Sequence, residues 1–298
     1  MFLFDSLKRH AAAFAAVATV ALGVACAPPA HAGPAVWVVK DADSTIYLLG
    51  TVHFLKPDTQ WRSANIDKAL KDSADLWLEV EADDPAVMQP LILKYGLDQA
   101  HPLSTKLSPE EFARLDAAAR GMGASGAALE PMRPWLAGVT LSVAPLLKAG
   151  YDPNSGVEAK LKAEAKAAGK PIRTLETAEQ QIRFFADMSP AMELTFLRSS
   201  LDDATDAPAL LDEMVAAWAG GDVAGIDRLM IAEMRADYPA LYELLLVRRN
   251  ADWAQQIDTL LKGKGVTIIA VGAGHLAGDE SVQAQLAKRG IKAERLKD

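Results

Sequence analysis

The chain has 298 residues, half of them hydrophobic, and carries 31 Lys and Arg against 39 Asp and Glu, which gives a formal net charge of −8. This apolar content excludes a disordered polyampholyte and is enough for a full globular core. The acidic balance argues against nucleic acid and anionic lipid as partners, because no Lys/Arg cluster is dense enough to release their counterions cooperatively. The length fits one large domain or two modest ones.

The first 32 residues have the pattern of a secretory signal peptide. A positive stretch at residues 8–10 precedes an apolar run from Ala11 to Val24, and Ala30-His31-Ala32 forms an A-x-A cleavage site. The apolar run is too short to cross a membrane, which takes about 20 residues. We therefore expect cleavage after Ala32, a mature domain over residues 33–298 with no transmembrane segment, and a periplasmic or secreted location.

Cys26 leaves one alternative open, which is a lipoprotein anchor. Gly23 stands where a leucine is expected three residues before a lipidated cysteine, so we favour the cleaved signal. Cleavage removes the only cysteine of the chain. The mature protein would then have neither a disulfide framework nor a thiol nucleophile.

The first half of the mature chain predicts alternating strands and helices. A hairpin is expected from two β-branched and aromatic runs, residues 35–40 and 45–49, around a polar turn. Short strands are expected over 75–79 and 170–175, and helices over 63–71, 108–121, the stretch from Pro134 to Leu147, and 157–168. Ser108-Pro109-Glu110-Glu111 is a capping box with proline at the first helical position.

The second half is mostly helical. Residues 192–262 predict several helices, interrupted at Gly220-Gly221 and Pro239, before a continuous β-branched strand over 266–271 and a last helix that closes the chain. Trp218, Met230 and Met234 fall at helical spacing and are expected in the core. The fold class is α/β (α+β), with a mixed central sheet flanked by helices and a largely helical insertion or lobe.

Four of the expected strands lead into a residue that can bind metal or act in catalysis. These residues are His53, Glu79, Glu176 and His275. Ligands of open α/β sheets bind at the carboxyl ends of strands, where residues distant in sequence meet. The pattern therefore predicts one site made of these four residues.

Both histidines stand in a strand–GxxH unit, Gly50-x-x-His53 and Gly272-x-x-His275. The matched context suggests a pseudo-repeat, and the glycines allow a sharp turn off the strand. Buried histidines bonded to backbone are the alternative. For Glu79 and Glu176 the alternative is a carboxylate facing solvent, and Glu81 or Asp83-Asp84 could replace Glu79 if the register differs. His101 lies in a polar loop and is expected to be structural.

Two imidazoles and one carboxylate form a common catalytic metal set with an open position for water. A second glutamate could then act as general base. Signatures of other enzyme classes are absent from the sequence, since there is no HExxH, GxSxG or GxxxxGK[ST] pattern. The Gly272-x-Gly274 loop lies too near the C-terminus to open a dinucleotide-binding unit.

A set of short motifs in chain order resembles the TraB/GumN family, relatives of the Tiki metalloproteases. The motifs are Ile46–His53, Leu78-Glu79-Val80, Gly169-Lys170-Pro171, Leu175-Glu176-Thr177, Ala217-Trp218, Gly221-Asp222, Arg249-Asn250, Trp253-Ala254 and Val271–Leu276. The resemblance covers nearly all of the mature chain. It implies the α/β fold of erythromycin esterase-like and ChaN-like proteins and a divalent-metal-dependent, proteolytic hydrolysis.

The same resemblance implies the roles of the site residues. His53, Glu79 and His275 would be the metal-binding set, and the family positions with less defined roles are Glu158, Glu176, Arg249 and Asn250. Arg249 could stabilise an oxyanion and Asn250 could orient substrate or water. The alternatives are that both residues only stabilise a helix end, and that Glu158 only complements a helix dipole.

The sequence thus predicts a secreted or periplasmic hydrolase that uses Mn²⁺, Co²⁺ or Zn²⁺ to activate water and cleave peptide bonds in a peptide or protein substrate. An envelope module that binds haem or another ligand through the same histidines is the first alternative. A metal-independent esterase with histidine as general base is the second. The substrate, the metal and the oligomeric state are left open by the sequence.

Overall fold

The structure is a computed structural model that describes residues 33–203 and 207–297. The signal peptide expected over residues 1–32, including Cys26, lies outside the described residues.

The described residues form six strands, with helices between most of them. The strands are β1 (Val36–Lys40), β2 (Ser44–Thr51), β3 (Asp75–Leu78), β4 (Ile172–Thr174), β5 (Gly265–Gly272) and β6 (Ala293–Arg295). The α-helices are α1 (Ala64–Asp72), α2 (Pro85–Tyr95), α3 (Pro109–Gly121), α4 (Gly126–Leu129), α5 (Pro134–Lys148), α6 (Val157–Ala167), α7 (Ala178–Ala186), α8 (Pro190–Asp203), α9 (Ala207–Ala219), α10 (Val223–Ile226), α11 (Ala232–Asp237), α12 (Pro239–Tyr242), α13 (Arg248–Leu261) and α14 (Val282–Lys288). Three 3-10 turns cover Leu103–Thr105, Pro153–Ser155 and Ala273–Leu276, and two π-helical segments cover Asp227–Ile231 and Glu243–Val247.

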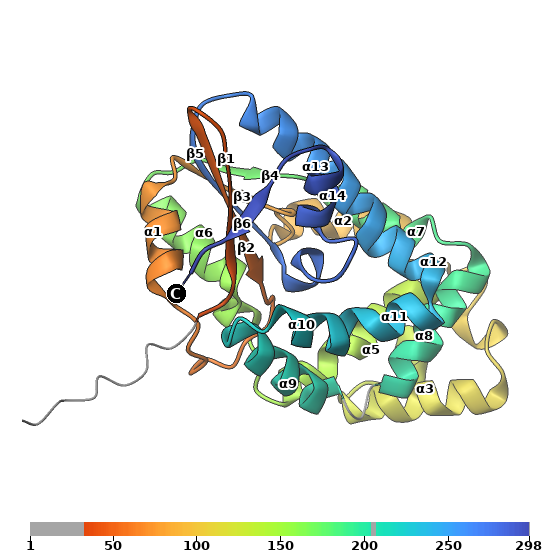
Figure 1. The fold of residues 1–298 in the computed structure, drawn as a ribbon. Coiled ribbons are helices and arrows are strands. Elements are labelled where there is room, and N and C mark those ends of the chain that lie inside the picture. The colour runs from red at the N-terminus through yellow and green to blue at the C-terminus, as the bar shows by residue number, and fades with distance from the viewer. Residues whose placement is uncertain (1–32, 204–206, 298) are drawn as a thin grey trace, which may run out of the picture. The chain divides into compact units, whose positions relative to one another are not determined.

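The strands form one mixed sheet in the order β4-β3-β5-β2-β1-β6 (Figure 1). The first four of these strands are parallel to one another. β1 pairs antiparallel with β2, and β6 pairs antiparallel with β1. The hairpin expected at the start of the domain is β1 and β2, with Val36 opposite Leu49. The mixed sheet flanked by helices confirms the predicted fold class.

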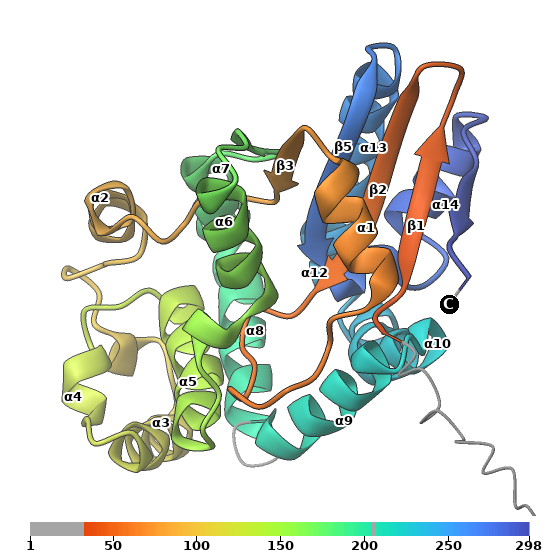
Figure 2. The same ribbon diagram turned by 90° about the vertical axis from the view of Figure 1, so that its left-hand side faces the viewer.

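Helices cover both faces of the sheet, which explains why β2 and β5 are continuously apolar. Figure 2 shows α1 in front of β2 and β5, with α13 on the far side. Along β2 the side chains alternate, so that Tyr47 and Leu49 join the core under α1 and α6, and Ile46 and Leu48 join the core under α13 and α14. Burial on both faces fixes the register of these strands, because a one-residue slip exchanges the two sets.

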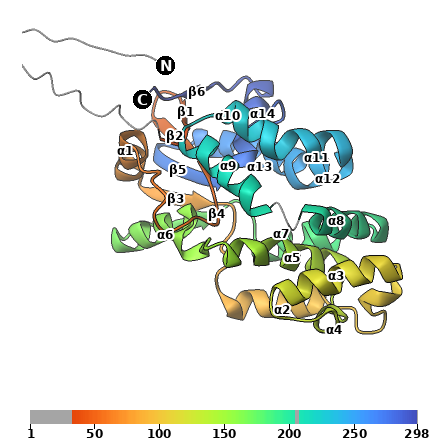
Figure 3. The ribbon, with the colours of Figure 1, turned by 90° about the horizontal axis from the view of Figure 1, so that it is seen from below.

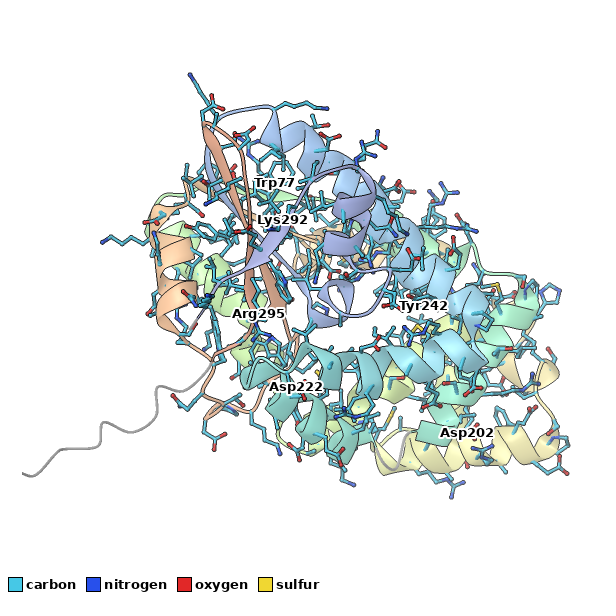
Figure 4. All side chains as sticks on the ribbon, in the orientation of Figure 1. Trp77, Asp202, Asp222, Tyr242, Lys292 and Arg295 are labelled. Atoms are coloured by element: carbon cyan, nitrogen blue, oxygen red, sulfur yellow. The ribbon has the colours of Figure 1, made fainter. Side chains whose placement is uncertain are left out.

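A second helical group is built on its own core. α3, α5 and α8 pack around Leu115, Leu141 and Leu197, and Figure 3 shows these helices grouped away from β1 and β2. The connection back to the sheet runs through α9 and α10, where the Asp222 side chain accepts a 2.8 Å hydrogen bond from Gly225 N at the start of α10 (Figure 4). Within residues 33–203 and 207–297, no helix is both long and apolar enough to cross a membrane.

Most elements predicted from the sequence are present, with three differences. The expected last helix is present as α14, but the chain closes with β6, whose three residues have no apolar run and are ordered by pairing with β1. The strand expected over 170–175 shortens to β4. Helices α2 and α7 were not predicted, although α7 begins with a capping box formed by Thr177 and Gln180, a signal that the sequence does carry.

Candidate active site

The four predicted site residues meet at one edge of the sheet. β4, β3, β5 and β2 are parallel neighbours, so their carboxyl ends lie side by side. Glu79 and Glu176 follow β3 and β4 directly or after one residue, and they are joined by a 2.8 Å hydrogen bond from Glu176 N to Glu79 O. His53 follows β2 after one residue and His275 follows β5 after two, which brings the two GxxH units next to each other.

Arg249, in the first turn of α13, connects the acids of this cluster. Its Nε and Nη2 donate to the two oxygens of Glu176 at 2.8 and 2.9 Å, and Nη2 also donates to Glu79 Oε2 at 2.8 Å. Nη1 donates to Leu245 O at 3.1 Å and lies 3.0 Å from His275 Nε2. All five N–H groups of the guanidinium are therefore used within the protein, and none is left for a substrate oxyanion in this arrangement.

Glu79 is buried and ionised. Burial by itself would raise the pKa of Glu79, but the positive charges of His275 when it is protonated, of Arg249 and of His53 outweigh it, together with a 2.6 Å hydrogen bond from Gly272 N, and hold the pKa below its ordinary value. The carboxylate is thus a permanent negative charge at the end of β3, next to the turn that follows β5.

His275 is held as a neutral imidazole by Asn250. Asn250 Nδ2 donates to Glu280 O at 2.8 Å, so its Oδ1 is the acceptor that faces His275 Nδ1 at 2.5 Å. His275 consequently carries its proton on Nδ1 and presents the Nε2 lone pair. Burial lowers the pKa of His275 to about 3, and the ring lies 4.3 Å from the ring of Trp253. The two ends of the Asn250 amide thus contact His275 and the backbone of Glu280.

His53 is held by Glu158 in an analogous way. Its Nδ1 lies 2.7 Å from Glu158 Oε1, and Thr51 donates its hydroxyl to the same oxygen. Desolvation lowers the pKa of His53, but the charge and hydrogen bond of Glu158 raise it more, to about 9. The His53 side chain is 59% exposed, so it is the part of the cluster that faces outward.

Gly156 explains how Glu158 reaches His53. A Cβ at Gly156 would lie 2.1 Å from His53 O, a distance that no side chain tolerates. Only glycine allows the start of α6 to approach the chain after β2 this closely, and Glu158 follows two residues later.

Glu176 lies behind Arg249 and is away from the exposed side of the cluster. Both of its oxygens bond to Arg249, and Trp253 Nε1 donates to Oε1 at 3.0 Å. Burial raises the pKa of Glu176 even though Arg249 opposes this shift. The structure therefore gives Glu176 a role in holding Arg249, where the sequence had suggested a general base.

An apolar cavity of about 630 Å³ opens beside the cluster. His53, Glu79, Arg249 and His275 line one side of it, and side chains of α5, α7, α9, α11 and both π-helical segments line the rest. Met230 and Met234 belong to this lining, and Met230 is 39% exposed, so placing it in the core was wrong. Helical spacing alone does not distinguish a core from a cavity wall.

Side chains of all three residues of the predicted metal set lie around Gly272. A Cβ at Gly272 would lie 3.1 Å from Glu79 Oε1, 3.7 Å from His275 Cδ2 and 3.8 Å from His53 Nε2, so this glycine leaves a cradle between them. Each imidazole has its Nδ1 bound to an acceptor, as in metal sites. To bind an ion, His53 would have to release the Nε2 proton that its raised pKa retains, and His275 would have to release its Nε2 from Arg249. As placed, however, the described residues contain no group of three His, Cys, Asp or Glu side chains that could share an ion.

Comparison with known proteins places the chain among uncharacterised relatives. It is 26% identical over 253 residues to the uncharacterized protein YbaP of Escherichia coli (strain K12), covering 85% of this chain and 92% of that protein. It is 23% identical over 270 residues to an uncharacterized protein of Treponema pallidum (strain Nichols), covering 85% and 80%. No solved structure matches the chain. Because the model of the TraB/PrgY/gumN family matches residues 35–295, the protein belongs to that family.

Proposed function

We propose that the protein is a divalent-metal-dependent hydrolase that cleaves peptide bonds and holds its metal with His53, Glu79 and His275. The observation that carries the proposal is the cradle at Gly272, on which two imidazole edges and one ionised carboxylate converge. A bound ion would lower the pKa of a water molecule and polarise the scissile carbonyl. The predicted signal peptide supports action outside the cytoplasm.

The protein's own residues prepare this site. Asn250 keeps the proton of His275 on Nδ1, and Glu158 orients His53 through its Nδ1. Arg249 Nη1 occupies the position in front of His275 Nε2, so it has to give up this contact when His275 binds an ion. Its bonds to Glu176 can keep Arg249 in place while this happens.

The test is the thermal midpoint of the metal-stripped protein titrated with Mn²⁺, Co²⁺ or Zn²⁺. A ligand that binds only the folded state stabilises it by about 2.7 kcal/mol at a hundredfold excess over Kd, so a true site raises the midpoint visibly. We expect the rise to vanish in His53→Ala and in His275→Ala. His101→Ala is the matched control, because His101 is exposed and contacts Asp98 far from the cluster in sequence.

Hydrolysis of a peptide library is then measured in the presence of the ion that raised the thermal midpoint. Metal-dependent cleavage that is lost in both histidine variants supports the proposal. No shift with any of the three ions, together with unchanged hydrolysis in both variants, rules out the metallohydrolase.

A ligand-binding module is the second candidate, favoured by the apolar cavity next to the exposed His53. Haem titration tests it. A Soret band that His53→Ala or His275→Ala removes, without hydrolysis of any peptide or ester, would establish this function in place of the first.

A further inference from the structure

Two cavities that differ in the charged side chains of their walls meet at the cluster. The apolar cavity of about 630 Å³ and a smaller one of about 340 Å³ share His53, Glu79 and Gln181. The smaller cavity continues along Asp83, Glu158 and Lys162. The site therefore has a side that is apolar away from the cluster and a side that carries further charged side chains, with the proposed reacting groups at their junction.

The apolar side offers almost no hydrogen bonds. Among the described side chains that line its helical wall, Gln181 is the only uncharged amide, and it lies at the junction. Trp135 already donates its Nε1 proton to Tyr95 O at 3.3 Å, and Arg249 has no N–H left over. Any polar group placed deep in this cavity would lose its bonds to water without replacement.

We propose that the substrate is a long acyl chain joined by an amide or ester bond to a polar head group that is not anionic. The acyl chain occupies the larger cavity, the head group occupies the smaller cavity, and the carbonyl lies at the junction beside His53 and Glu79. This inference rests on the metal-dependent hydrolysis of the proposed function, and it replaces the peptide substrate proposed there with an acyl amide or ester.

The lining favours an acyl chain over a peptide of apolar residues. A peptide carries an N–H and a C=O at each residue, and each one buried without a partner costs free energy. Peptides often satisfy these groups by pairing with an exposed strand edge. The edges of this sheet are β4 and β6, and neither strand supplies a residue to the apolar cavity.

The size of the cavity also fits a long chain. A water molecule takes about 30 Å³ of the liquid, and a methylene group is of similar size, so roughly sixteen methylene groups fill on the order of 500 Å³. Burying each methylene group is worth about a fourfold gain in affinity. Binding should therefore tighten steeply with chain length until the cavity is full.

The charged side chains that line the smaller cavity limit which head groups can bind there. Glu79, Asp83 and Glu158 line it, and its lysine, Lys162, is already paired with Asp83 at 2.6 Å and with Glu81 at 3.2 Å. A phosphate or sulfate would find no free cation on these side chains apart from His53, which is bound to Glu158. An uncharged or cationic head group fits this lining.

The reaction balances as a simple hydrolysis. The oxygen of water bonds to the acyl carbon, and the bond from that carbon to the nitrogen or oxygen of the head group breaks. One proton of water goes to the leaving atom, and the other leaves the new acid. The products are a fatty carboxylate and a free amine or alcohol.

The test uses N-acylethanolamines with acyl chains of about four, eight and twelve carbons, below their micelle concentrations. Binding to the metal-free protein is measured by calorimetry, and amine release is measured with the metal present. Wild-type affinity should rise about fourfold per methylene group. Met230→Glu puts a charge on the cavity wall, and Val139→Trp fills the cavity without a charge. Both should abolish the dependence on chain length.

Leu93→Glu is the matched control, because Leu93 is a 65% exposed apolar residue on α2 that does not line either cavity. It should bind like the wild type. Affinity that is independent of chain length, or that Met230→Glu and Val139→Trp both leave unchanged, overturns the inference. So does tighter binding of an uncharged leucine tripeptide amide than of the longest acyl chain. Chain-dependent binding without amine release in any metal supports the acyl site and counts against the proposed hydrolysis.

Discussion

At the scale of single residues, Arg249 is the residue on which the cluster depends. It is a buried cation that neutralises two buried carboxylates, Glu79 and Glu176, and stacks over Trp253 with its guanidinium carbon 4.8 Å from the ring centre. Removing one partner of such a group leaves an uncompensated buried charge. The sequence had offered an oxyanion role or a helix-end role for this residue, and the structure supports a third, which is to hold the acids in place.

Arg249→Met should therefore destabilise the fold strongly. We expect a loss of about 3–5 kcal/mol in the free energy of unfolding, because Glu79 and Glu176 lose their counter-charge in a buried site. Urea unfolding measures it. Arg248→Met is the neighbouring control, since Arg248 forms an exposed pair with Glu243 worth no more than about 1 kcal/mol. Equal losses in the two variants would contradict the central position of Arg249.

The two site histidines should give the metal-free protein a bell-shaped dependence of stability on pH. The pKa of His53 is raised from 6.5 to about 9, so its contribution is present below about pH 6.5 and is lost as the pH rises toward 9. The pKa of His275 is lowered from 6.5 to about 3, so its contribution is present above about pH 6.5 and is lost as the pH falls toward 3. Glu79, whose pKa is lowered, adds to the loss of stability as the pH falls below about 4.5.

Thermal midpoints measured from about pH 4 to 10 should thus be highest near pH 6.5, where His53 and His275 both contribute to stability. In His53→Gln the alkaline decline should flatten while the acid decline remains. A variant that keeps the full alkaline decline would show that another group causes it.

At the scale of elements, the site depends on close approach between segments that are distant in sequence. The start of α6 approaches the turn after β2 at Gly156, and the turn after β5 approaches Glu79 at Gly272. Neither glycine has a positive φ, so neither is needed for its own backbone conformation. What each provides is the missing side chain, and a sequence read one segment at a time does not show this.

Gly156→Ala should separate α6 from His53. The added Cβ would lie 2.1 Å from His53 O, so the helix start has to move, and the 2.7 Å contact between His53 and Glu158 is lost with it. We expect a lower thermal midpoint and a loss of the metal-induced rise. Gly121→Ala is the control, because nothing lies within 4 Å of its Cβ position at the end of α3. The control should be neutral or slightly stabilising, by up to about 1 kcal/mol.

At the scale of the whole molecule, helices between β4 and β5 supply most of the cavity wall beside the cluster at the sheet edge. The two π-helical segments contribute cavity-lining side chains, Met230 and Ile231 from one and Leu245 and Leu246 from the other. π-Helical turns often occur at functional sites. Helix α9 is tied to the first GxxH unit by a 2.8 Å hydrogen bond from Trp218 Nε1 to Gly50 O.

Trp218→Phe should weaken this connection. Gly50 O would be left buried without its side-chain donor, at a cost of about 1–3 kcal/mol beyond the lost apolar area. Chemical denaturation measures the difference from Trp77→Phe, which makes the same substitution but removes only a 3.1 Å bond to Asp75 at a half-buried position on β3 (Figure 4). If the two variants lose equal stability, the bond to Gly50 does not connect the helices to the sheet.

The sequence by itself determined the elements and the edge at which the site forms. The β-branched and aromatic run of β2 and the capping box at Ser108 depend only on neighbours in the chain, and they predicted the strand and helix that are present. The carboxyl ends of parallel strands lie at the same edge of a sheet, whatever the order of the strands. His53, Glu79, Glu176 and His275 were therefore correctly expected at one edge.

Only the tertiary structure decided what each site residue contacts. Whether Glu176 faces a substrate or Arg249, and whether Met230 lies in a core or on a cavity wall, depends on how α7, α9 and α13 pack over the sheet. The local sequence pattern predicts a helix and its apolar face, but it does not predict which other segment packs against that face. The assignment of roles required contacts between residues far apart in the chain, which no local pattern encodes.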